Sequence, residues 1–253
     1  MQLDLSSNQL CGVNENGNGY YTAEGITAIA DALRVNGGLT ALDLSLNDLR
    51  DEGVNAVCEA IQSNKETKLA SLDMGLNSIG SVGAKSVAAM MAVTGALTSL
   101  DLSNNQLCGL DRFGLGTFTA EGITAIADAL RVNGAVTVTN LLGNQLDMKS
   151  AKMLAEVAKL KGISLCGIQR DQTTANFSFK GLKPPDAILL ASDLSQADVT
   201  GGLTSIDPSR NQLCGIWTDW ADWEGDQHGT YTAEGITAIA DALRVNGALT
   251  KIE

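Results

Sequence analysis

The side chains best suited to contact a partner lie in one segment, CGIWTDWADWEGDQHGTY, at residues 214–231. It holds Trp217, Trp220 and Trp223 at a spacing of three, which would place the three rings on one side of a helical turn. Clustered aromatic rings on a loop are typical anchors for a protein partner, and packing of these rings onto the chain's own surface is the alternative. We therefore expect either a binding site or a local packing cluster at these three tryptophans.

The same segment also carries acidic side chains and the one histidine of the chain: Asp219, Asp222, Glu224, Asp226 and His228. Carboxylates in a cluster can bind a hard cation, but their order lacks the DxDxDG spacing of a calcium loop. A solvated acidic loop is the preferred interpretation, so we predict no metal site. The sequence also lacks the GxxxxGK[ST], GxSxG and HExxH motifs, and a single histidine excludes most histidine-dependent catalysis. We predict that the chain is not an enzyme and needs no cofactor.

A second candidate site is a row of acidic residues at equivalent places in a repeated LDLS motif. The row consists of Asp4, Asp43, Asp73, Asp101 and Asp207, and Asn140 and Asn176 occupy the remaining places. Such a row offers acceptors to a basic or polar partner, whereas LDLS as an ordinary repeat consensus would make the same residues structural. Apolar residues beside the row would add contacts: Leu46, Leu76, Leu142 and Phe179.

These residues are positioned by an internal repeat. The pattern LxLxxNxL begins at Leu3, Leu42, Leu72 and Leu100, with weaker copies from Thr139, Ala175 and Ile206 and an eighth beginning at Ile252. The repeats become regular, at 28 residues, once insertions at about 11–21, 108–118 and 214–231 are set aside. We interpret residues 1–253 as a single array of about seven repeats, with an irregular joint at about 161–174.

Each repeat predicts one strand and one helix. Leu3 and Leu5 alternate with polar residues, as in a short strand with one polar face. The segment TAEGITAIADALRVNG places Ile26, Ile29, Ala30 and Leu33 on one side of a helix, with Thr22 as the expected N-cap and Gly37 as the expected stop. Because packed helices need more space than neighbouring strands, the array should curve with its strands inside. The predicted fold is an α/β solenoid, with parallel strands on the concave face and helices on the convex face.

The three insertions hold eight of the ten aromatic residues of the chain, and each precedes an identical copy of TAEGITAIADALRVNG. Long loops on a rigid scaffold commonly carry binding, so we add Tyr20 and Phe113 to the candidate partner contacts. The aromatic residue next to each TAEG is instead expected to pin its loop against the helix start; these are Tyr21, Phe118 and Tyr231. The cysteines, which include Cys11, Cys108 and Cys214 at equivalent places, are expected to be small buried core residues.

The charge balance restricts the possible partners. With 29 acidic and 17 basic residues the net charge is −12, which disfavours binding to nucleic acid or to an anionic membrane and favours a partner with a basic surface. No apolar run reaches the roughly 20 residues of a membrane span, and an odd number of cysteines without a CxxC motif is typical of reduced thiols. We expect a cytoplasmic protein.

The pattern NxLxxEGxxxxxxAIxxNxxLTxLDLSxN, read from Asn47, resembles the ribonuclease-inhibitor-like class of leucine-rich repeats. The resemblance implies a scaffold for protein binding, used here through the concave face and the aromatic loops. The class also contains a Ran GTPase activator, so a regulator of a small GTPase is one alternative, although Arg112 has no matching motif around it. A structural assembly unit is the other alternative, because uncapped ends could associate end to end.

Overall fold

The computed structural model describes residues 1–13, 18–218 and 227–253. The chain divides into two compact units, Met1–Gln145 and Leu146–Glu253, which are called here the N-terminal and C-terminal units. The division falls ahead of the segment 161–174 that was expected to form a joint. Among the helices of the described residues, none is both long and apolar enough to cross a membrane.

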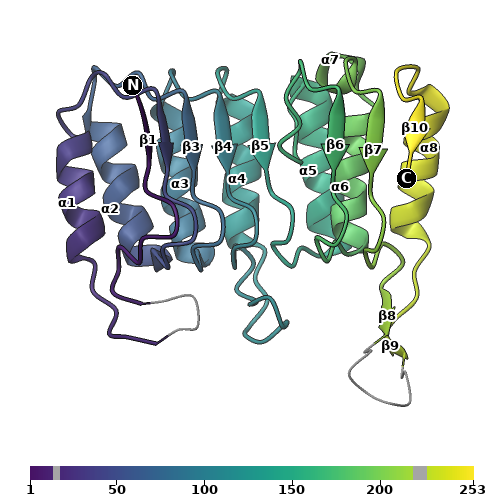
Figure 1. Cartoon of the computed structure of the whole chain (residues 1–253), viewed down its shortest axis with the longest axis horizontal. Coiled ribbons are helices and arrows are strands. Elements are labelled where there is room, and N and C mark those ends of the chain that lie inside the picture. Colours follow the sequence, from purple (N-terminus) through teal and green to yellow (C-terminus); the bar gives the residue numbers. More distant parts are fainter. Residues whose placement is uncertain (14–17, 219–226) are drawn as a thin grey trace. The chain divides into compact units, whose positions relative to one another are not determined.

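The N-terminal unit is a five-stranded parallel sheet whose strands are each followed by a helix or by the unit boundary (Figure 1). The sheet order is β1-β2-β3-β4-β5, so each strand pairs with the next one along the chain. The elements are β1 (Gln2–Asp4), α1 (Glu24–Leu33), β2 (Ala41–Asp43), α2 (Arg50–Ser63), β3 (Ser71–Asp73), α3 (Ser81–Val93), β4 (Ser99–Asp101), α4 (Glu121–Val132) and β5 (Val138–Asn140).

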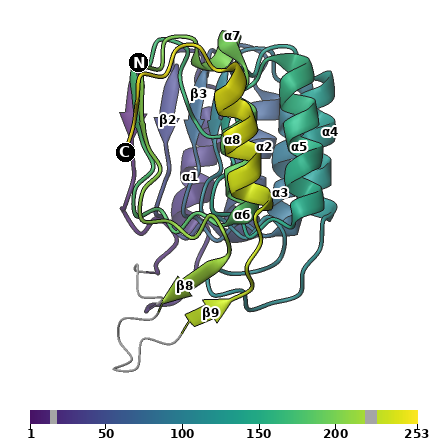
Figure 2. The same cartoon turned by 90° about the vertical axis from the view of Figure 1, so that its right-hand side faces the viewer.

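The C-terminal unit contains a three-stranded parallel sheet in the order β10-β7-β6 and a separate antiparallel hairpin, β8–β9. Its elements are α5 (Met148–Lys161), β6 (Thr174–Asn176), α6 (Pro184–Leu194), α7 (Ala197–Thr200), β7 (Ser205–Asp207), β8 (Ile216–Thr218), β9 (Gln227–Gly229), α8 (Glu234–Val245) and β10 (Lys251–Ile252). In each unit the helices cover one face of the sheet (Figure 2). The opposite face is called the strand face below.

The strands occupy the eight places that the repeat predicts, and the α/β solenoid fold is confirmed. The leucine at the centre of each regular strand is buried under the helices, as Leu42, Leu72 and Leu100 are, while its two neighbours are only half-buried. Three-residue strands of this kind are too short to be stable alone, so the parallel pairing to the next repeat and the packing of its helix hold them in place.

A ladder of buried asparagines joins the repeats of the N-terminal unit where the chain leaves each strand. The Asn77 Oδ1 accepts hydrogen bonds from the amides of Asn47 (3.0 Å) and Leu49 (3.3 Å), and its Nδ2 donates to the Leu44 carbonyl at 2.9 Å. Asn47 and Asn105 repeat this arrangement. These side-chain amides therefore satisfy the backbone of each turn and join it to the neighbouring repeat.

The helix ends differ from the expectation. The N-cap of α1 is Ala23, not Thr22, whose Oγ1 instead accepts a 3.3 Å hydrogen bond from the Glu24 amide. The turn after α1 is stabilised by Asn36 and not by Gly37. The Asn36 Oδ1 accepts hydrogen bonds from the amides of Gly38 (2.9 Å) and Leu39 (2.8 Å). A carboxamide can accept from both amides at once, which the flexible glycine beside it cannot do.

Candidate protein-interaction surfaces

The described ends of the three insertions pair in the same way; the insertions, residues 11–22, 108–119 and 214–232, are called here the edge hairpins. In each, the cysteine carbonyl accepts a hydrogen bond of 2.9–3.0 Å from a threonine amide: Thr22 to Cys11, Thr119 to Cys108 and Thr232 to Cys214. Just inside this closure lies an antiparallel pair: Val13 with Gly19, Leu110 with Gly116 and Ile216 with Gly229. The same stem pairing therefore occurs in all three insertions, although their sequences between the paired residues differ.

A pair of glycines makes this stem possible. A Cβ atom on Gly116 would lie 2.2 Å from the carbonyl oxygen of Gly109, and one on Gly19 would lie 2.1 Å from that of Gly12. Gly116 also has a φ of 127°, which side chains rarely tolerate. This requirement was not predicted from the sequence, although its signal is present there: a glycine directly after each cysteine, and a second glycine two residues before the aromatic next to each TAEG.

The middle hairpin displays two apolar side chains to solvent. Phe113 is 71% and Leu115 67% exposed, and the Arg112 guanidinium lies over the Phe113 ring at 4.7 Å. The loop is held by Asp111, whose Oδ1 accepts hydrogen bonds from the amides of Phe113 (2.9 Å) and Leu115 (2.8 Å). This hairpin can therefore offer an apolar tip that is already ordered.

In the first hairpin, adjacent tyrosines have different environments. Tyr20 is 95% exposed, whereas the Tyr21 hydroxyl donates a 2.8 Å hydrogen bond to the Leu49 carbonyl. The Arg50 guanidinium lies over the Tyr21 ring at 4.6 Å, and partial burial raises the pKa of Tyr21 to about 12. Tyr21 is thus an anchor, but it ties the hairpin to the start of α2 and not to the start of its own helix.

The corresponding residues of the other two hairpins are less enclosed. Phe118 is 40% and Tyr231 63% exposed, and Phe118 has no hydroxyl with which to make the bond of Tyr21. The hydrogen bond that anchors Tyr21 is therefore not available to Phe118, and an anchoring role for Phe118 and Tyr231 stays a prediction.

The third hairpin contains the tryptophans. Trp217 lies in strand β8, paired with His228 of β9, so its placement on a helical turn is wrong. Trp220 and Trp223 lie outside the described residues, as do the acidic residues 219, 222, 224 and 226. Their role in binding stays a prediction.

The acidic row of the N-terminal unit runs in register across the sheet. Asp4, Asp43, Asp73 and Asp101 are successive partners in the parallel ladder, and Asn140 continues the row. Each aspartate Oδ1 accepts a hydrogen bond of 2.8–2.9 Å from the backbone amide two residues later. Asp207 does the same in the C-terminal unit, with Ser209. One oxygen of each carboxylate therefore supports the local turn.

The electrostatics of the row differ along its length. Burial, followed by repulsion from Asp101 and Asp43, raises the pKa of Asp73 to about 6. The pKa of Asp4 is lowered instead, because the Ser6 hydroxyl and amide donate to its carboxylate. At the other end, the Asn140 Nδ2 donates to the Asp101 Oδ2 at 2.7 Å. The centre of the row thus carries repulsion that a bound cationic group would relieve.

The apolar residues beside the row have an unusual backbone. Leu46, Leu76 and Phe179 have φ values of 58°, 57° and 56°, in the left-handed region, and are 46%, 46% and 68% exposed. Side chains of this size are rare in that conformation. The fourth candidate, Leu142, is buried and does not belong to this surface, contrary to our expectation.

Comparisons with known proteins agree with this architecture. The family model described as Leucine Rich repeat matches residues 39–58 and 65–88. NACHT, LRR and PYD domains-containing protein 12 of Mus musculus is 41% identical over 90 residues, and that of Homo sapiens is 37% identical over 86. These alignments cover 35% and 34% of this chain but only 8% of each relative.

Among solved structures, the leucine-rich repeat-containing protein LegL7 from Legionella pneumophila is similar at 18% identity. That likeness covers all of this chain and 82% of that protein, with a TM-score of 0.45.

Proposed function

Because the chain is a leucine-rich-repeat protein, we propose that it binds a protein partner through the strand face and the first two edge hairpins of its N-terminal unit. The strand face supplies the acidic row, and the hairpins supply Tyr20, Phe113 and Leu115. A partner with a basic surface fits the row, since its cations would neutralise carboxylates that now repel one another.

The backbone conformation of Leu46 and Leu76 is the observation that carries this proposal. Both are exposed leucines held at a positive φ, where the equivalent place in the fourth repeat has Asn104, a residue that tolerates this conformation. Strain retained at exposed apolar residues is typical of functional sites, because it costs stability and contributes nothing to the core. Contact with a partner accounts for both the apolar side chains and their place beside the acidic row.

The test is the double variant Leu46→Asn with Leu76→Asn. Asparagine tolerates a positive φ, so we expect the free energy of unfolding to rise by about 1 kcal/mol for each site. We expect the recovery of specifically captured proteins to fall at least tenfold, because two apolar contacts are lost. Urea denaturation measures the first effect, and quantitative mass spectrometry of proteins captured from extract measures the second.

Leu160→Asn is the matched control. Leu160 is 81% exposed on α5, has a helical backbone and lies in the C-terminal unit, so neither stability nor capture should improve or fall appreciably. Unchanged capture by the double variant would exclude this part of the strand face as the binding site, whatever its effect on stability.

A further inference from the structure

The C-terminal unit contains a cavity of about 510 Å³, which is called here the α5–α7 cavity. Cavities of about 300–1,000 Å³ are the usual size for a small ligand. Three stretches of the chain line this one: the last turn of α5, the segment between α5 and β6, and the start of α7. They contribute Lys159, Lys161, Gly162, Arg170, Gln196 and Asp198.

Two of these three stretches are additions to the regular repeat. The repeat that begins at Thr139 has 36 residues before the next one begins at Ala175, whereas the regular repeat has 28. The regular repeats have one helix between successive strands, but α6 and α7 both lie between β6 and β7. The repeat period therefore does not require the walls of the cavity.

The added walls are held in place by the core and by each other. Ile168 is 1% exposed, whereas Arg170 nearby is exposed to solvent. Arg170 lies in a turn that is closed by a hydrogen bond from the Gln172 amide to the Gln169 carbonyl at 3.1 Å. A Cβ on Gly202 would lie 3.2 Å from the Arg170 carbonyl oxygen, so glycine lets the chain after α7 pack against this turn. The cavity is therefore formed before any ligand binds.

Cations dominate the lining of the cavity. Lys159, Lys161 and Arg170 contribute three positive charges and Asp198 contributes one negative charge, so the lining has a net charge of +2 in a chain whose net charge is −12. Lysines at the end of a helix are favoured by the helix dipole, which accounts for Lys159 and Lys161. It does not account for Arg170, which comes from a different stretch of the chain.

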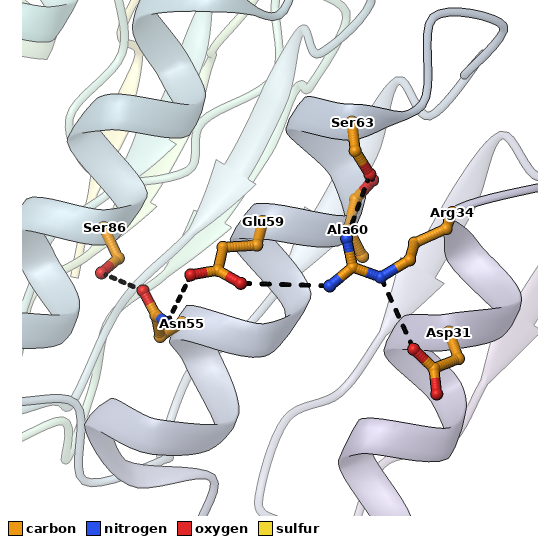
Figure 3. Close-up of polar contacts among 7 residues, drawn as sticks. All are labelled: Asp31, Arg34, Asn55, Glu59, Ala60, Ser63 and Ser86. Carbon is orange, nitrogen blue, oxygen red and sulfur yellow. Dashed lines mark hydrogen bonds and ion pairs between the residues drawn. The ribbon is translucent and has the colours of Figure 1, made fainter.

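Elsewhere in the chain, cations on the helices lie beside acids. The Arg34 guanidinium lies 3.5 Å from the Asp31 carboxylate and 3.9 Å from that of Glu59 on the neighbouring helix, as Figure 3 shows. Lys85 of α3 lies 2.5 Å from Glu121 of α4. By contrast, the three cations of the α5–α7 cavity form no ion pair within residues 1–13, 18–218 and 227–253. Their charges are therefore available to a ligand.

We propose that the α5–α7 cavity binds a phosphate monoester. Such a group carries a charge of about −2 at pH 7, which the net charge of the lining balances. The planar guanidinium of Arg170 can donate two parallel hydrogen bonds to phosphate oxygens, and the two lysines act as point charges beside it. None of the residues that line the cavity is aromatic, so a nucleobase would have no ring on which to stack. The phosphate group itself is therefore what the cavity recognises.

The test is a titration of the full chain with N-acetyl-O-phosphoserine amide, followed by ¹H–¹⁵N NMR. The salt is kept at about 50 mM NaCl, because higher salt screens exposed charges. We expect saturable amide shifts confined to residues 159–162, 168–172 and 195–198, with a Kd of about 1 mM. The same compound without its phosphate should cause no shift.

Variants of the cavity assign the binding to its cations. Arg170→Gln should lower the affinity about tenfold, because it removes the bidentate donor. Lys159→Gln with Lys161→Gln should also lower it about tenfold, at roughly threefold for each exposed charge. The amide spectrum of each variant separates a folding defect from a binding defect.

Lys65→Gln with Lys68→Gln is the matched control. Both lysines are exposed, follow α2 in the N-terminal unit and form no ion pair with the residues that the structure describes. The same loss of charge at this place should leave the Kd unchanged.

Two further probes distinguish the source of the phosphate. Tighter binding of a phosphoserine pentapeptide than of glycerol phosphate assigns the ligand to a phosphorylated partner protein, and the reverse order assigns it to a free metabolite.

The proposal is overturned if no saturable shift occurs below about 20 mM phosphoserine amide, or if the shifts fall outside the cavity. It is also overturned if the Lys65 and Lys68 control weakens binding as much as the cavity variants do. N-acetylglutamate amide that bound as tightly as the phosphoserine amide would contradict it as well, since the cavity would then fit the carboxylates of an acidic peptide.

Discussion

At the scale of single residues, Asp193 organises the C-terminal unit. It is fully buried on α6, and its carboxylate accepts hydrogen bonds from the Ser164 hydroxyl (2.7 Å) and from the amides of Leu165 (2.8 Å) and Cys166 (3.0 Å). These contacts hold the segment between α5 and β6, which has no regular element of its own to fix it. Burial raises the pKa of Asp193 to about 7, although these donors act in the opposite direction.

This pKa predicts a pH dependence of stability. The folded pKa lies above the ordinary value of 3.8, so the native state binds an additional proton between these two values. We therefore expect Asp193 to make the free energy of unfolding fall as the pH rises from about 4 to about 7. Asp193→Asn should lose this slope, and should also cost about 1–3 kcal/mol at pH 4.5 because its amide group cannot accept all three hydrogen bonds.

Urea denaturation at pH 4.5, 6 and 7.5 measures both effects. Asp198→Asn, at an exposed place on α7, should keep the slope of the wild-type protein. A slope that is unchanged in Asp193→Asn would assign the pH dependence to other groups.

At the scale of elements, the edge hairpins show how a repeat array carries loops of different lengths without losing its period. Each hairpin leaves and rejoins the repeat at the same hydrogen bond between a cysteine carbonyl and a threonine amide. The stem isolates the loop from the core, so the residues beyond it can vary for binding. The glycine pair is the feature on which this depends.

Gly116→Ala tests that dependence. The new Cβ would meet the Gly109 carbonyl oxygen and the φ of 127° would be strained, so we expect a loss of about 1–3 kcal/mol in the free energy of unfolding. Gly114→Ala is the control, because its φ is also positive but no atom lies within 4 Å of the new Cβ. It should cost no more than about 1 kcal/mol by urea denaturation. Equal losses would mean that the close approach in the stem is not important.

At the scale of the whole molecule, hydrogen-bonded asparagine ladders and apolar packing both stabilise the contacts between neighbouring repeats. The asparagines at the strand ends connect each turn to the next, and those after the helices connect the helix ends. Stability in such an array is approximately a sum of repeat and interface terms. An asparagine that joins two repeats should therefore contribute more to the free energy of unfolding than the asparagine of the first repeat.

Asn77→Ala tests this expectation against Asn8→Ala. Asn77 is buried and bonds to the neighbouring repeat, and its loss leaves two amides without an acceptor, at an expected cost of about 2–4 kcal/mol. Asn8 is exposed, and its Nδ2 donates within its own repeat, to Ser6, so the cost should stay below about 1 kcal/mol. If the two variants shift the urea midpoint equally, the asparagine ladder does not stabilise the contacts between repeats.

Part of the candidate site could be predicted from residue types. Tyr20 and Phe113 are exposed, as their place on long inserted loops suggested, and the acidic row lies in register because the repeat aligns equivalent residues. The left-handed leucines could not be predicted, because the turn that fixes their φ is closed by hydrogen bonds from the neighbouring repeat. The strand at Trp217 was missed because its pairing partner, His228, lies eleven residues further along the chain, so no local pattern reveals the pairing.

The sequence by itself determined the order and places of the strands and helices, because the periods of apolar residues and the turn asparagines are local signals. The tertiary structure alone decided which sides of the helices are covered. One segment of sixteen residues occurs identically in α1, α4 and α8, yet Ile29 of α1 is half-buried, Ile126 of α4 is fully buried, and Ile236 of α8 is exposed where Ile26 of α1 is not. Burial depends on the neighbour that packs against a face, and an identical sequence has no information about its neighbours.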